Sequence, residues 1–195
     1  MPSIISHAIV PTALGLALGD AVISRRLLLL GVIAAMLPDM DVLAFRFGVP
    51  YTHDFGHRGM SHSLAFALFL GMLAGVFAAQ LHAPRRSAVF FVFLAAASHG
   101  LLDMLTNGGL GIALFWPISN ERLFFPLRVI EVSPLSLRRF FSSAGVTVLT
   151  SEFLRVWLPS AMVGASIFFC RRILRFNGAQ SERAMAASHE AKKQG

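Results

Sequence analysis

The chain has little cysteine and little charge. Of its 195 residues, one is a cysteine, Cys170, and only 14% are Asp, Glu, Lys or Arg. A single cysteine excludes an intrachain disulfide and a thiolate cluster, so a metal site in this protein would have to use histidine and carboxylate ligands. With 55% hydrophobic residues and a mean hydropathy of +0.67, the scarcity of charge excludes an ordinary soluble domain and predicts a membrane protein.

Five apolar runs are each long enough to cross a hydrocarbon core of about 30 Å. They cover residues 8–23, 27–45, 64–81, 87–105 and 153–170. The first two are interrupted by Pro, Gly or Asp and predict a span less strongly than the third and the fifth. All five are continuous rather than alternating, which argues against a transmembrane barrel. The sequence therefore predicts an all-α fold, a polytopic transmembrane helical bundle of four to five spans.

An interfacial segment is expected between the fourth and fifth spans. Residues 106–150 mix aromatic side chains with arginines, a composition that suits the headgroup region of a membrane. We expect residues 1–175 to form one membrane-embedded domain and residues 176–195 to form a disordered polar tail. The first apolar stretch has no basic region before it, so it is predicted to be retained rather than cleaved as a signal peptide.

The net charge of +7 comes from small arginine clusters at the ends of apolar runs. Such clusters, without one basic patch, argue against a nucleic-acid partner. If every run crosses once, the pairs Arg25/Arg26 and Arg85/Arg86 and the group at 171–175 lie on one face, which the positive-inside rule makes cytoplasmic.

Histidines and aspartates gather on the opposite face under the same topology. Residues 51–63 alone hold three of the seven histidines, and His99 and Asp103 lie one helical turn apart. His82 and His189 fall on the cytoplasmic side or in the tail and are excluded. The residues expected to converge are His7, Asp39, Asp41, His57, His62, His99 and Asp103.

Neutral imidazole with carboxylate oxygen suits a divalent metal, zinc first, with manganese or iron as alternatives. The expected metal ligands are His7, Asp39, His62, His99 and Asp103. Asp41 and His57 are expected to be further ligands, ligands of a second ion, or a general base. Arg58 is expected to stabilise an anionic oxygen in the transition state. A metal with an open position makes hydrolysis the natural reaction class.

Simpler interpretations exist for the same residues. Asp39 and Asp41, after Pro38, could end a helix in a solvated turn. His99 and Asp103 could hydrogen-bond each other within the bundle. His7 alone could be an interfacial histidine, His53 and Asp54 are more typical of a loop, and Arg58 could bind lipid phosphate or backbone.

Several motifs resemble those of one family. They are SHAIVPTALGLALG near the start, PDMD at 38–41, HRGMSHS at 57–63, SHGLLDMLTNGG at 98–109 and FWPIS at 115–119. In this order they resemble the YdjM-like group of integral inner-membrane proteins, described as membrane-bound metal-dependent hydrolases. The resemblance covers about the first 120 residues and implies a metal-dependent hydrolase without a named substrate. The order of His and Asp is also similar to that of the metal ligands of zinc-dependent phospholipases C, which implies a phosphoester.

The sequence thus predicts a multi-pass inner-membrane, metal-dependent hydrolase of a lipid or lipid-linked phosphoester, with its site at the extracytoplasmic membrane boundary. Membrane lipids are the expected partners, and the oligomeric state stays open. The alternative is a non-enzymatic membrane protein, a metal or proton transporter or an interaction partner, that uses the same cluster. A transporter needs a polar route through the bilayer, and no charged residue interrupts 64–81.

Overall fold

The computed structural model describes residues 1–134 and 136–193, and side chains at 137, 179 and 181–193 are not described. Within this part the chain is helical, with two isolated β-bridges and no longer strand, which confirms the all-α prediction. The α-helices are α1 (Ile4–Leu18), α2 (Arg25–Met36), α3 (Leu64–Val76), α4 (Arg85–Met104), α5 (Leu137–Phe140), α6 (Ser143–Glu152) and α7 (Leu158–Lys193). Two 3-10 segments, η1 (Leu37–Phe47) and η2 (Met60–His62), and one π-helical turn, η3 (Phe153–Trp157), complete the order.

The five apolar runs correspond to five helical segments. Three are long and apolar enough to cross a membrane: Arg25–Phe47, Arg85–Met104 and Ser143–Gly178. The other two, α1 and α3, are shorter apolar helices. A perpendicular crossing needs about 20 helical residues, so α1 and α3 are shorter than a typical complete span.

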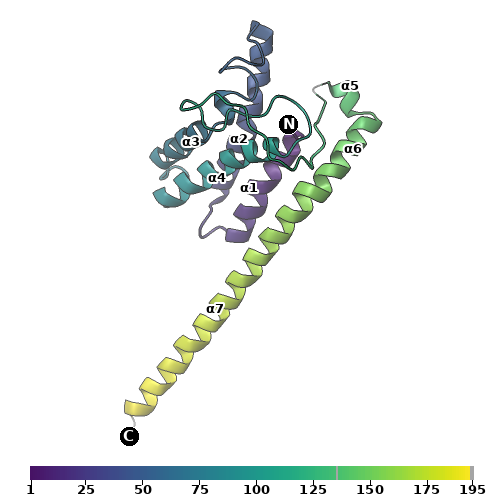
Figure 1. Cartoon of the computed structure of the whole chain (residues 1–195). Helices are drawn as coiled ribbons and strands as arrows, with labels where there is room; N and C mark the ends of the chain where they lie inside the picture. Colours follow the sequence, from purple (N-terminus) through teal and green to yellow (C-terminus); the bar gives the residue numbers. More distant parts are fainter. Residues whose placement is uncertain (135, 194–195) are drawn as a thin grey trace.

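Helix α4 is the centre of the bundle and contacts α1, α2 and α3, while α7 packs along α1 (Figure 1). Phe91 of α4 inserts where α1 and α2 carry glycine. A Cβ built on Gly31 would lie 2.3 Å from the Phe91 ring, and one on Gly15 would lie 3.3 Å from it. The two glycines therefore let α4 approach both neighbouring helices.

The α3–α4 contact uses Gly71 and Gly75. A Cβ on Gly71 would lie 2.7 Å from the Val89 carbonyl oxygen, and one on Gly75 would lie 2.5 Å from the Val89 side chain. Gly19 has a different role. It ends α1 with a φ of 69°, and a Cβ there would meet nothing within 4 Å.

Pro38 changes the helix type between α2 and η1. Proline lacks the N–H that an α-helix interior needs, and the chain continues from Leu37 as a 3-10 segment until Gly48, which has a φ of 74°. Asp39 and Asp41 lie in this segment. Their backbone thus belongs to a continuous apolar helix of 23 residues rather than to a solvated turn.

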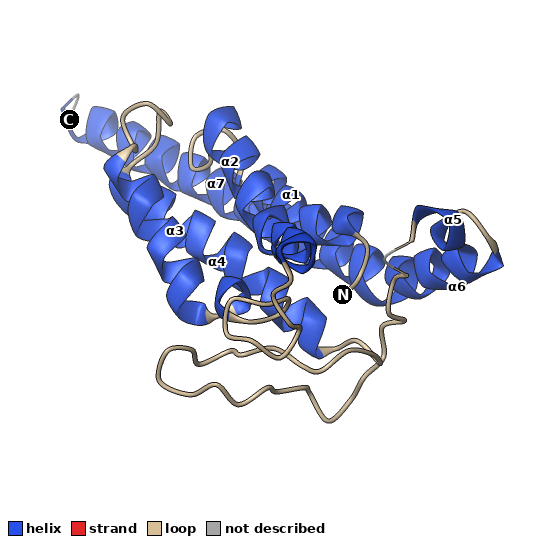
Figure 2. Cartoon of the chain, turned by 90° about the horizontal axis from the view of Figure 1, so that it is seen from above, coloured by secondary structure: helices blue, strands red, loops and turns tan. Residues whose placement is uncertain are grey.

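Two long loops, 48–59 and 105–134, lie together beside the helices (Figure 2). They are joined by backbone hydrogen bonds, including one from Ala113 N to Arg58 O at 3.0 Å. The irregular connection is shorter than predicted, because α6 starts at Ser143, where the Ser142 side chain accepts a bond from Ala144 N. From there the helix continues through η3 into α7.

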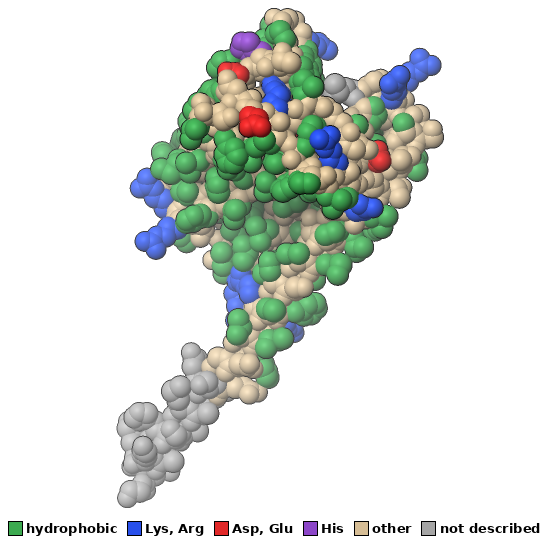
Figure 3. All heavy atoms as spheres, in the orientation of Figure 1, with side chains coloured by type: hydrophobic (Ala, Val, Ile, Leu, Met, Phe, Trp, Pro, Cys, Tyr) green, Lys and Arg blue, Asp and Glu red, His purple; other side chains and the backbone are tan. Residues whose placement is uncertain are grey.

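Helix α7 continues to Lys193, past residue 176, where the sequence predicted a polar tail to begin. The boundary between the membrane domain and the tail stays a prediction. Large apolar side chains cover much of the outer surface of the bundle (Figure 3), among them Leu29, Phe69 and Phe90, each more than half exposed. This surface suits contact with lipid.

Candidate metal centre

The eight residues predicted to form the site lie together at one end of the bundle. Four parts of the chain contribute them: α1 carries His7, η1 carries Asp39 and Asp41, the 48–59 loop and η2 carry His57, Arg58 and His62, and α4 carries His99 and Asp103. All are buried except Asp41, which is partly buried. The structure thus shows the predicted convergence, while the role of each residue stays a prediction.

Asp39, His62, His99 and Asp103 form the centre of the group, and each offers a ligand atom within 4.8 Å of the other three. The Nε2 atoms of His62 and His99 are 3.0 Å apart. Asp39 Oδ1 lies 3.5 Å from His99 Nε2, and Asp103 Oδ2 lies 3.4 Å from His62 Nε2. Ligands of a tetrahedral zinc ion with bonds of about 2.0–2.1 Å are about 3.4 Å apart. These three distances are therefore close to what one such ion requires, and the remaining pairs lie within 4.8 Å.

Hydrogen bonds behind the two imidazoles fix which nitrogen faces the centre. His99 Nδ1 lies 2.7 Å from the Ala35 carbonyl oxygen, which can only accept a proton. His62 Nδ1 lies 3.2 Å from Asp41 Oδ2. With Nδ1 donating in each case, both Nε2 atoms are left free to bind a cation, as is common for histidines that ligate metals.

His7 adjoins this tetrad. Its ring stacks on His99 with 3.7 Å between centroids, and its Nε2 lies 3.7 Å from Asp103 Oδ1 and 3.8 Å from Asp39 Oδ2. The side chain is fully buried and neither ring nitrogen has a hydrogen-bond partner in the described chain. An ordinary interfacial histidine would not be expected to leave both nitrogens buried without partners.

Arg58 contacts three groups of the chain. Its Nε lies 3.0 Å from Asp103 Oδ2, Nη1 donates to the Gly108 carbonyl and Nη2 donates to Thr106 Oγ1. Gly109 makes room for the guanidinium, since a Cβ there would lie 2.5 Å from Nη1. These partners make Arg58 a positioning residue for Asp103. Its predicted role at an anionic oxygen remains a prediction.

Asp41 connects the tetrad to His57. Its Oδ1 lies 2.6 Å from His57 Nδ1, and its Oδ2 accepts bonds from the Ser61 hydroxyl at 2.5 Å and from Arg58 N at 3.1 Å. With His57 and His62, Asp41 forms a second group with metal-ligand spacing. The two groups share His62.

The residues fit a bound cation. Both carboxylate oxygens of Asp39 and of Asp103 are shut off from solvent and lack a hydrogen-bond partner among the described residues. A buried carboxylate without compensation costs several kcal/mol, so such groups in proteins are paired or coordinate metals. Arg58 forms an ion pair with Asp103. Asp39 has no arginine or lysine among its ion-pair partners in the part of the chain that the structure describes.

His57 and His62 differ in their pKa. Burial lowers the pKa of His57, and the hydrogen bond to Asp41 offsets only part of this. Burial also lowers the pKa of His62, but the neighbouring carboxylates of Asp103 and Asp41 outweigh it and raise that pKa to about 9. In the metal-free protein at neutral pH, His62 is therefore protonated and His57 is neutral.

Other predicted loop residues lie apart from the tetrad. His53 is exposed and its Nδ1 accepts a bond from Phe55 N, while Asp54 accepts one from Asn120. Sequence reasoning missed Arg122, which donates to the carbonyl oxygens of His57 and Tyr51 and so fastens the two loops together. It also missed Glu152, which is buried and accepts bonds from residues near the start of α1. No local pattern marks either residue.

Comparison with known sequences agrees with this arrangement. The YdjM inner membrane protein family matches over residues 1–176. The chain belongs to this family. It is 45% identical over 174 residues to "Inner membrane protein YbcI" of Escherichia coli (strain K12), an alignment that covers 88% of this chain and 100% of that protein. No solved structure matches. The YdjM resemblance inferred from the motifs is thus confirmed, and it extends beyond residue 120.

Zinc binding should strengthen as pH rises. A histidine must be neutral to bind metal, and His62 is protonated below about pH 9, so binding must displace a proton. We expect the zinc affinity of this YdjM-family protein to rise at least tenfold per pH unit between about pH 6 and about pH 8. Competition with a fluorescent chelator would measure it. A His53→Ala variant should show the same slope, and an affinity independent of pH would contradict the prediction.

Proposed function

We propose that this YdjM-family protein is a membrane-bound metal-dependent hydrolase of a lipid or lipid-linked phosphoester, with zinc as the first candidate metal and manganese or iron as alternatives. The observation that carries the proposal is the buried tetrad, which pairs two inward-facing imidazole nitrogens with carboxylate oxygens that have no hydrogen-bond partner. A divalent metal held there would polarise a phosphoryl oxygen and make a water molecule more acidic.

The neighbouring residues suit the remaining steps. Asp41 orients His62 and holds His57 Nδ1, which leaves His57 Nε2 able to take a proton. In hydrolysis, a water oxygen would bond to phosphorus, its proton would pass to His57, and the P–O bond to the leaving group would break. The leaving oxygen would then receive that proton. His57 is neutral at pH 7, as a general base must be.

A groove beside the tetrad supports a lipid-like substrate. This cavity of about 330 Å³ is walled by Asp39 and by apolar residues, among them Ile5, Met40, Val42 and Phe140. Ile5 and Met40 are about half exposed, so the groove opens on the apolar outer surface. It therefore joins the membrane-facing side of the bundle to a predicted metal ligand, the route that a lipid chain would need.

We further propose that the protein lies in the inner membrane with this site on the extracytoplasmic side. Arg25, Arg26, Arg85 and Arg86 are at the helix ends away from the tetrad, and Arg26 donates to Gln80 O between α3 and α4. Positive residues favour the cytoplasmic side of short connections. The family description and the name of the Escherichia coli relative both state an inner-membrane location for those proteins.

Removing a tetrad ligand should remove the metal. We expect His99→Ala and Asp103→Asn to lower the zinc content of the purified protein at least tenfold, because each deletes one of four ligand atoms. Elemental analysis would measure it, with His53→Ala as the control histidine outside the tetrad. Unchanged zinc content in both ligand variants would rule out this ligand set.

The same variants separate catalysis from transport. The metal-loaded protein should release phosphate or a phosphorylated headgroup from a panel of lipid phosphoesters, and Asp103→Asn should reduce that rate at least a hundredfold. Metal uptake into proteoliposomes without any hydrolysis would favour the transporter instead.

Filling the groove should impair only lipid-like substrates. We expect Val42→Trp to lower kcat/KM for a long-chain phospholipid about tenfold, because the indole would occupy the space for the chain. Zinc content and hydrolysis of a short, water-soluble phosphoester should stay unchanged. Leu29→Trp, on the exposed surface of α2, is the matched control. An equal effect of both variants would contradict a substrate groove.

The orientation can be read from cysteine labelling. In a Cys170→Ser background, a cysteine at Thr52 should react with a membrane-impermeant maleimide added outside spheroplasts, because the 48–59 loop lies at the tetrad end. A cysteine at Gln80 should react only after the membrane is opened. The reverse pattern would place the site in the cytoplasm.

A further inference from the structure

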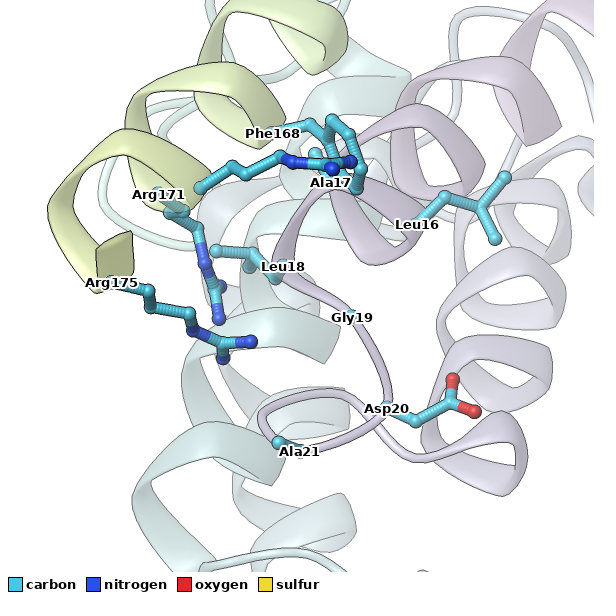
Figure 4. A pocket seen from close by; sticks show the side chains of 10 residues that line it. Leu16, Ala17, Leu18, Gly19, Asp20, Ala21, Phe168, Arg171 and Arg175 are labelled. Atoms are coloured by element: carbon cyan, nitrogen blue, oxygen red, sulfur yellow. The ribbon is translucent and has the colours of Figure 1, made fainter. Parts of the chain in front are cut away.

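A second cavity, also of about 330 Å³, lies at the opposite end of the bundle (Figure 4). Its walls are the end of α1 with the turn that follows, residues 16–21, and the face of α7 that carries Phe168, Arg171, Arg172 and Arg175. Leu18 is 11 residues beyond His7 along α1, or about 16 Å at 1.5 Å per residue. The cavity is therefore separate from the metal centre.

The helical repeat puts the three arginines on the side of α7 that faces α1. Positions 168, 171, 172 and 175 follow the spacing of one helical face. Helices α1 and α7 also pack closely at a point that precedes these arginines in α7, since a Cβ on Gly164 would lie 3.0 Å from the Ala13 carbonyl oxygen. In Figure 4 the side chains of Arg171 and Arg175 both extend from α7 toward the space beside Leu18.

The positive charge in this cavity is not neutralised by the described chain. Asp20 is the carboxylate in the cavity wall. It forms an ion pair with Arg25 at 3.6 Å rather than with an arginine of α7. The carbonyl end of α1 contributes about half a negative charge, which is small against three guanidinium groups. Like charges held together favour a bound anion.

The position of the arginines indicates the source of that anion. They directly follow the apolar stretch of α7 whose side chains Met162, Val163 and Phe169 are mostly exposed, a surface suited to lipid tails. Guanidinium groups bind phosphate through paired hydrogen bonds, and basic pockets between membrane helices bind anionic headgroups. The positive-inside rule accounts for arginines at this end, but not for three of them converging on a cavity between two helices.

We propose that this cavity binds the headgroup phosphate of an anionic membrane phospholipid. The lipid tails lie along the exposed apolar side of α7, and Arg171, Arg172 and Arg175 hold the phosphate beside the end of α1. Because the cavity is remote from the tetrad, the proposal is independent of metal binding and of hydrolysis.

Native mass spectrometry of the full chain in detergent tests the proposal. The probes are phosphatidylglycerol and phosphatidylcholine with the same acyl chains, and inorganic phosphate alone. We expect the unmodified protein to retain phosphatidylglycerol at least tenfold more than phosphatidylcholine, and Arg171→Gln/Arg175→Gln to lose this preference. Arg85→Gln/Arg86→Gln removes the same charge from exposed positions at the start of α4 and should keep the preference within twofold.

Two outcomes would overturn the proposal. Equal loss in both double variants would show general attraction to positive charge, and binding of inorganic phosphate as tight as that of the lipid would show a site for a free anion. Thermal melting tests whether a variant loses lipid binding because it is misfolded. Phosphatidylglycerol should raise the Tm of the unmodified protein and of Arg85→Gln/Arg86→Gln but not that of the milder Arg172→Gln variant, and a rise in all three would count against the site.

Discussion

The burial of negative charge at one end of an apolar bundle is the constraint on which the rest of this structure depends. Two helical segments bring Asp39, Asp41 and Asp103 together, with Asp39 and Asp103 buried and Asp41 partly buried. Each buried carboxylate needs a partner, because the cost of an unpaired one is comparable to the whole stability of a domain. Asp103 has Arg58, and Asp41 has three donors, but the ion-pair partners of Asp39 within the described residues are the imidazoles of His7 and His99. A cation is the partner that would complete the set.

The bundle is built so that these groups meet. Phe91 packs against Gly15 and Gly31. This contact holds α1, α2 and α4 together at a point on α4 that precedes the site. Since α4 is one continuous helix from Arg85 to Met104, the same contact fixes where its last turns place His99 and Asp103. Pro38 prevents α2 from continuing as an α-helix and so turns Asp39 toward α4. Packing at one end thereby sets ligand spacing at the other.

The sequence predicted this convergence because counting apolar runs is enough to say on which face each run starts and ends. The distances within the site follow from contacts that no local pattern contains. Arg122 joins two loops about 70 residues apart in the chain, and Glu152 accepts bonds from Ser3 and Ser6, nearly 150 residues away. The apolar run that predicts the last span starts at 153, whereas the helix starts at Ser143, in a stretch where Gly145 and several serines and threonines are weak helix formers. In the structure, the Ser142 cap and the Glu152 contacts stabilise that helix instead.

The same contacts bear on whether the site holds one ion or two. Asp41, His57 and His62 have the spacing of a second metal site, but Asp41 already accepts bonds from Ser61, Arg58 N and His57. An ion at this place would have to break those bonds, and His62 would have to bind a metal through both nitrogens. Asp39 and Asp103, in contrast, have no hydrogen bond to another described residue that a cation would have to break, and the contact of Asp103 Oδ2 with Arg58 Nε at 3.0 Å is an ion pair that leaves Oδ1 available. The balance of hydrogen bonds therefore favours a single ion in the tetrad, with Asp41 acting on it through His62.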